Sequence, residues 1–167
     1  MTRFLTLLGF VCLIAMLLPA CAPAPEPEPE PAPEPVFDQA AEEAAIRNVA
    51  EQMKASFNAH EAKGCVANTD ENYENWLGTV KGREAFEKQR LEDIARYPDV
   101  QASFLDEIGI VFVTPDVAIR KTRTEWTGMT DAEGKLLPSR KTLDAQVYVK
   151  RNGKWLRTAA FFRPIEE

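Results

Sequence analysis

The spacing of apolar side chains changes at Pro98, and this change constrains the fold more than any other feature. Before Pro98, one face of a helix is marked at every third or fourth position by Ile46, Val49, Met53, Phe57 and His60. Asp38 is a suitable N-cap for this helix, and Gly64 breaks the pattern. After Pro98, apolar and polar residues alternate, which is typical of strands. Helices followed by strands predict an α+β fold, with the helices packed on one face of an antiparallel sheet.

Four strands are expected after Pro98, each antiparallel to the next. They cover residues 100–112, 117–128, 143–150 and 155–164, with turn sequences between them. In the third strand Leu143, Ala145 and Val147 alternate with polar residues, so we expect these three to face the helices. The earlier segment 72–78 (NYENWLG) is rich in turn formers and is expected to be a loop.

Residues 1–20 have the composition of a secretory signal peptide. Arg3 is the only charge before an apolar run that ends at Leu18, and this run is shorter than the about 20 residues of a membrane-spanning helix. The following Leu18-Pro19-Ala20-Cys21 resembles the bacterial lipobox, which implies an acylated Cys21 that tethers the chain to a lipid bilayer. The domain would then lie in the periplasm or another extracytoplasmic space of the cell envelope. An ordinary signal peptide with an incidental cysteine is the alternative.

Residues 21–36 are expected to be a spacer in front of one domain at 37–167. Proline at every second position excludes a helix and favours polyproline II, which would span on the order of 45 Å here. A proline-rich ligand for another protein is the less favoured interpretation. Cys65 is the one cysteine of the domain, so no disulfide within it is expected, and its apolar neighbours favour a buried thiol.

The charge distribution excludes some functions. The net charge of −6 argues against a nucleic-acid partner, and one histidine (His60) with three cysteines leaves little material for a metal site or a metal cofactor. Residues 38–114 carry 8 basic and 15 acidic groups, whereas residues 115–164 carry 11 basic and 5 acidic groups. A basic sheet would favour anionic ligands. Mutual solvation of helices and sheet is the favoured alternative.

Several short pieces together resemble the SnoaL-like, SgcJ/EcaC-type branch of the nuclear transport factor two-like superfamily. They are Asn58-Ala59-His60-Glu61-Ala62, Gly82-Arg83-Glu84-Ala85, Thr114-Pro115-Asp116-Val117-Ala118 and Asn152-Gly153-Lys154-Trp155. The resemblance implies a cone-shaped roll, in which helices pack on a curved four-strand sheet around an apolar pocket. It implies no particular reaction, because this fold carries enzymes and plain binding domains.

The chain lacks the catalytic residues of the superfamily's ketosteroid isomerases. By the resemblance, the positions of their base, their second acid and their tyrosine fall on Trp76, Ala145 and Met53, and none of these side chains can transfer a proton. We therefore assign no catalytic residue. The last strand also carries Phe161-Phe162 where the branch often has a polar pair, which makes the expected pocket more apolar.

The expected function is binding of a small hydrophobic or amphipathic molecule without catalysis. An isomerase or dehydratase that uses a carboxylate near Asp70–Glu74 is one alternative, and a protein-interaction module of the envelope is another. Arg120 could bind a ligand carboxylate if it faces inward, although a place at a strand end in contact with water is favoured. The expected pocket residues are Met53, Phe57, Tyr73, Trp76, Arg120, Trp126, Leu143, Ala145, Val147 and Phe162.

A homodimer is expected through the outer face of the sheet. By the same alternation, Tyr148, Trp155 and Phe161 point away from the helices and form an apolar patch. Aromatic side chains dominate the energetics of protein interfaces. We therefore expect self-complementary contacts about a two-fold axis.

Overall fold

The structure is a computed structural model that describes residues 37–165. The segments expected to be a signal peptide and a spacer, with Cys21, lie outside the described residues. Residues 36–167 form a compact unit of their own. Within the described part, no helix is long and apolar enough to cross a membrane.

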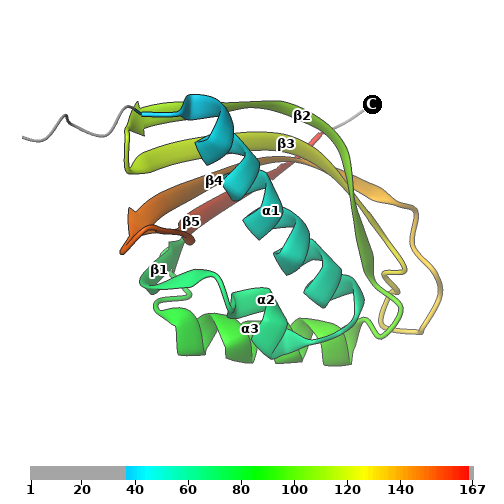
Figure 1. Cartoon of the computed structure of the whole chain (residues 1–167). Helices are drawn as coiled ribbons and strands as arrows, with labels where there is room; N and C mark the ends of the chain where they lie inside the picture. The colour runs from blue at the N-terminus through cyan, green and yellow to red at the C-terminus, as the bar shows by residue number, and fades with distance from the viewer. Residues whose placement is uncertain (1–36, 166–167) are drawn as a thin grey trace, which may run out of the picture. The chain divides into compact units, whose positions relative to one another are not determined.

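The described chain is an α+β fold with three helices and one five-stranded sheet. In Figure 1 the curved sheet arches over α1, and α2 and α3 lie on the same side of the sheet. The strand order is β1-β5-β4-β3-β2. The elements in chain order are α1 (Gln39–Asn58), α2 (Ala62–Val66), β1 (Thr69–Asn75), α3 (Arg83–Arg96), β2 (Gln101–Thr114), β3 (Val117–Thr127), β4 (Arg140–Arg151) and β5 (Lys154–Pro164).

Helix α1 begins at the predicted N-cap Asp38 but ends at Asn58, before the break that the sequence places at Gly64. The Asp38 side chain accepts a hydrogen bond from the Ala41 backbone N–H at 3.1 Å and so caps the first turn. The chain leaves the helix at His60, whose positive φ of 59° is incompatible with further helix. One face of α1 is buried against the sheet and the other helices, through Ile46, Ala50, Met53 and Phe57.

The expectation of four strands is wrong, because β1 adds a fifth. Its sequence, TDENYEN, is acidic and has few of the residues that favour strands, so it reads as a loop. Tertiary pairing overrides that preference: β1 runs parallel to β5, with Thr69 opposite Arg157 and Asn75 opposite Ala160. This strand brings Tyr73 under α3, where its ring stacks on Phe86 at 4.5 Å between centroids.

The predicted facing of β4 is also wrong. The residues that face the helices are the polar set, and Asp144 and Gln146 are buried there. Leu143, Ala145 and Val147 lie on the other face of the sheet and are half-buried. The alternation is as predicted, but its sign is reversed, because the inner face of this sheet is the polar one.

Two of the three aromatic residues predicted for an outer patch lie on the inner face of the sheet instead, so the prediction is wrong for both. Tyr148 and Trp155 are 0% and 3% exposed and pack with Ile46 and Ala118 under α1. A shift in register between β4 and β5 occurs next to Val147 and Tyr148. Beyond that shift Phe161 lies opposite Ala145, on the outer face.

The core has two parts. Under the N-terminal half of α1, Ile46, Ala118, Tyr148 and Trp155 form a small packed cluster. Under its C-terminal half, a larger cluster includes Met53, Phe57, Cys65, Tyr73 and Phe86. The expected burial of Cys65 is confirmed. The second cluster encloses the site described next.

Candidate ligand-binding cavity

A cavity of about 180 Å³ lies between the helices and the inner face of the sheet. Its apolar walls include Met53 and Phe57 from α1, Tyr73 from β1 and Phe86 from α3. Trp126 from β3 and Phe162 from β5 complete the aromatic lining. A cavity of about 150 Å³ already holds a benzene-sized molecule, so this space admits a small apolar body.

The structure brings together about half of the predicted pocket residues. Met53, Phe57, Tyr73, Trp126 and Phe162 line the cavity. The other predicted residues do not line it: Trp76, Arg120, Leu143, Ala145 and Val147. Trp76 is 74% exposed, and its ring contacts Phe161 on the outer side of the sheet. The three β4 residues are absent from the lining because their strand faces the other way.

The floor of the cavity is polar. Thr124, Asp144 and Gln146 reach it from β3 and β4. The Thr124 hydroxyl donates a hydrogen bond to Oδ2 of Asp144 at 2.5 Å, whereas Oδ1 is buried and has no partner among the described residues. Burial raises the pKa of the Asp144 carboxyl, and the hydroxyls of Thr124 and Thr142 oppose that rise. Asp144 therefore holds a proton at higher pH than an exposed aspartate.

Arg157 reaches the cavity from β5 and is 8% exposed. Its guanidinium carbon lies 4.8 Å from the centroid of the Phe86 ring and 5.6 Å from that of Tyr73. The Nε atom is buried without a hydrogen-bond partner, and the side chain makes no ion pair within residues 37–165. Cation–π contacts contribute about 2 kcal/mol when desolvated, which is less than the several kcal/mol that burying an ion costs.

Arg90 lies beside Arg157 and comes from α3. Its Nη2 is 2.6 Å from Oδ2 of Asp93, and its guanidinium carbon lies 5.0 Å from the Phe86 ring centroid. The Nε atom is buried and lacks a partner within the described chain. Burial lowers the pKa of Arg90; Asp93 opposes this effect and the charge of Arg157 adds to it. Two guanidinium groups therefore share one aromatic ring in a desolvated place.

A second cavity of about 220 Å³ adjoins the first. The two share Phe57, Arg90, Trp126 and Phe162 as lining residues. Trp126 stands between its neighbours, with ring centroids 5.4 Å from Phe57 and 6.4 Å from Phe162, and its Nε1 donates to the Thr142 hydroxyl at 3.0 Å. Phe162 is 43% exposed, so this aromatic group also forms part of the way out to solvent.

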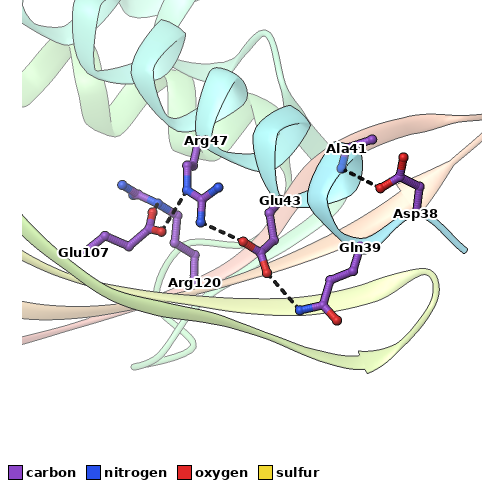
Figure 2. Close-up of polar contacts among 7 residues, drawn as sticks. All are labelled: Asp38, Gln39, Ala41, Glu43, Arg47, Glu107 and Arg120. Atoms are coloured by element: carbon purple, nitrogen blue, oxygen red, sulfur yellow. Dashed lines mark hydrogen bonds and ion pairs between the residues drawn. The ribbon is translucent and has the colours of Figure 1, made fainter.

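Arg120 faces inward, which is the orientation that binding of a ligand carboxylate would need. It lines neither cavity, however. It is 3% exposed, and the favoured place at a strand end in water is wrong. Its Nε donates to Oε2 of Glu107 at 2.8 Å, and Oε1 of the same carboxylate accepts from Nε of Arg47 at 2.8 Å (Figure 2). Arg47 also donates to Glu43. This chain of charges joins α1 to β2 and β3, so Arg120 has a structural partner.

The acidic cluster at residues 70–74 does not line either cavity. Asp70 is buried, where its Oδ1 accepts from the Asn72 backbone N–H and its Oδ2 lies 3.4 Å from Nε of Arg151. Glu71 and Glu74 are exposed or nearly so, and His60 lies 3.3 Å from the Val100 carbonyl oxygen, outside both linings. No cluster of metal-ligating side chains occurs within residues 37–165.

Sequence reasoning missed Arg90, Arg157 and Asp144. Asp144 alternates with Leu143 and Ala145, and assigning the apolar residues to the inner face placed it outside. Arg90 is one of many charges on a polar helix, and only the packing of α3 singles it out. The sequence could have indicated Arg157, because it lies two residues after Trp155 and therefore faces the same side of the sheet. Trp155 is the most completely buried residue of β5.

Comparison with known proteins supports the fold and leaves the chemistry open. No protein-family model matches the chain, and no curated protein matches its sequence. A Nostoc punctiforme domain of unknown function with a cystatin-like fold has a TM-score of 0.65 at 18% identity, covering 78% of this chain and 81% of that one. This chain has the nuclear transport factor two-like fold, also called cystatin-like.

Two similar structures carry the names of enzymes. The hexachlorocyclohexane dehydrochlorinase LinA-type3 from Novosphingobium barchaimii has a TM-score of 0.64 at 18% identity, covering 75% of this chain and 91% of that chain. A protein from Novosphingobium aromaticivorans with a provisional scytalone dehydratase name has a TM-score of 0.63 at 16% identity, covering 76% and 86%. At these identities the likeness concerns the fold alone.

Proposed function

We propose that the domain binds a small amphipathic molecule in the cavity between α1, α3 and the sheet. The observation that carries this proposal is the combination of aromatic walls with a buried polar floor whose Asp144 and Arg157 still have unpartnered atoms. Buried polar groups of a folded protein are normally hydrogen-bonded. An amphipathic ligand would satisfy them while its apolar part fills the space beside Met53, Phe57 and Trp126.

Binding of Nile red, a neutral apolar dye, tests this proposal. The dye should bind the purified domain at residues 36–167 and quench its tryptophan fluorescence through Trp126. Ala102 is a small residue of the cavity lining, so Ala102→Phe should fill the space and abolish binding. Ala145→Phe adds the same ring on the outer face and should leave binding unchanged. A wild-type domain that binds no dye would contradict the proposal.

A second candidate function is proton transfer by Asp144. A buried carboxyl with a raised pKa in an apolar cavity is suited to act as an acid or base. Binding is favoured over catalysis because the lining of the first cavity holds no histidine and no carboxylate other than Asp144 to receive the proton. The second lining adds one carboxylate, Asp93, which is already paired with Arg90. Turnover that is lost in Asp144→Asn, with ligand binding retained, would favour the enzyme.

We also propose that Cys21 carries a lipid that tethers this domain in the cell envelope. The support is the signal-like segment 1–20 with its lipobox-like end and the proline-rich spacer at 21–36. Cys21→Ala removes the thiol that would take the lipid, so the variant should leave the detergent phase in a partitioning experiment. Equal partitioning of both forms would contradict the anchor.

The homodimer through the outer face of the sheet remains part of the proposal, with different residues. Tyr148 and Trp155 no longer contribute, but Leu143, Val147 and Phe161 lie half-buried on that face. Lys121 and Arg123 lie opposite Ala145 and Leu143 on the same face, so a second copy of this chain would cover a surface of apolar and charged side chains together.

A further inference from the structure

Three cationic side chains line the first cavity, and they differ in whether the described chain pairs them with a carboxylate. Lys54 lies 2.6 Å from Glu51, and Arg90 lies 2.6 Å from Asp93. Arg157 is the exception, because no carboxylate within residues 37–165 pairs with it although it is 8% exposed. A buried charge without a counter-ion is strongly unfavourable, so such a group is kept where something outside the chain completes it.

Asp144 does not fill that role. It is the only carboxylate in the lining of the first cavity, its Oδ2 is engaged by Thr124, and it forms no ion pair with Arg157 or Arg90. The two arginines lie over the same Phe86 ring, with guanidinium carbons 4.8 and 5.0 Å from its centroid. Each has a buried Nε with no partner among the described residues. Two cations that line one cavity and each keep a free donor form a site for an anion.

From this geometry we infer that the polar end of the ligand is a carboxylate, held between Arg157 and Arg90. The planar guanidinium fork matches the two oxygens of a carboxylate and binds them in pairs. The apolar body then lies against Met53, Phe57 and Trp126, in the cavity of about 180 Å³ and the adjoining one of about 220 Å³. This inference rests on the proposed function, and it narrows the ligand to amphipathic carboxylic acids.

Octanoate and octan-1-ol test the inference, because they share an apolar chain and differ in the head group. Each is titrated against the Nile red complex of residues 36–167 at neutral pH. Octanoate should displace the dye at a concentration at least roughly tenfold lower than octan-1-ol, since hydrogen bonds to charged groups are worth about one to two powers of ten in affinity. Arg157→Met and Arg90→Met should each abolish this preference, because each removes a charged donor from the site of the head group. Arg163→Met, which removes an exposed arginine from the same strand, should change neither.

The outcomes separate the inference from the function on which it rests. Equal displacement by octanoate and octan-1-ol in the wild type would overturn the carboxylate site and leave the binding cavity intact. A preference for octanoate that persists in both arginine variants would overturn the assignment to Arg157 and Arg90. A domain that binds neither the dye nor either probe would overturn the proposed function as well. If Arg157→Met does not fold, displacement of the dye by octanoate and by octan-1-ol in the wild type and in Arg90→Met tests the inference.

Discussion

The two halves of α1 cover two different kinds of interior. Under its N-terminal half, Ile46, Tyr148 and Trp155 pack closely, and the buried Arg120 shares a carboxylate with Arg47 (Figure 2). Under its C-terminal half lies the cavity, where the buried Arg157 lies over two aromatic rings and pairs with no carboxylate among the described residues. The same sheet thus supplies a buried arginine at both places, but the chain provides an anion at only one.

From this difference we infer that the two halves of α1 cover parts of the molecule with different roles, one in stability and one in ligand binding. A paired buried arginine holds α1 to the sheet, because removing either partner would leave the other charge unpaired. An unpaired one weakens the fold, and natural proteins tolerate such groups mainly where a site needs them. The closed half of the molecule is therefore expected to determine stability, and the half with the cavity is expected to determine binding.

Truncation of apolar residues along α1 should produce the largest contrast. Ile46→Ala removes a fully buried side chain from the packed half and should lower the free energy of unfolding by about 4 kcal/mol. Met53→Ala removes a side chain that already borders empty space, so it should cost only about 2 kcal/mol. Urea denaturation of both variants measures the difference. Equal losses would show that the two halves are packed alike.

Removal of the shared carboxylate should give the next largest effect. Glu107→Gln leaves Arg120 buried without an anion, as Arg157 is, and should lower the free energy of unfolding by about 3 kcal/mol. Asp106→Asn is the matched control on the same strand, because its pair with Arg123 is about half exposed and is worth about 0.5 kcal/mol. Denaturation midpoints that do not distinguish the two variants would contradict the structural role of Arg120.

The pH dependence of stability should report Asp144 in the half with the cavity. Because burial raises its pKa, the folded chain holds this proton more tightly than the unfolded chain, whose aspartate titrates near its ordinary value of about 3.9. Between that value and the raised pKa, the stability contributed by Asp144 falls as the pH rises. Asp144→Asn removes this titration, so its free energy of unfolding should rise relative to that of the wild type as the pH increases above about 4. Unfolding curves with parallel pH profiles would contradict this expectation.

A change on the outer face should have the smallest effect on the monomer. Val147→Lys places a charge where the sheet faces away from both interiors, so the free energy of unfolding should change by less than about 0.5 kcal/mol. The same change should abolish the proposed homodimer, which sedimentation of residues 36–167 would detect. Sedimentation of the wild type as a monomer at high concentration would argue against the dimer itself.

Some features of this protein follow from local sequence alone. The cap at Asp38 and the helical spacing up to Phe57 set the start and most of the length of α1, although the helix ends at Asn58 rather than at the expected break at Gly64. The switch to alternation after Pro98 sets the α+β class, and the four strands β2–β5 lie close to their predicted ranges. These features depend on residues that are near one another in the chain, so their physical causes are visible in the sequence.

The tertiary structure decided everything that defines the candidate site. Alternation in β4 shows that neighbouring residues face opposite ways, but only packing decides which set faces the helices, and here Asp144 does rather than Ala145. Strand β1 exists because β5 offers it an edge, against its own preference. Whether Arg120 or Arg157 has an anion depends on residues far away in the chain, such as Glu107. Sequence alone therefore determined which residues are charged, and only the folded chain determined which charges are left without a partner.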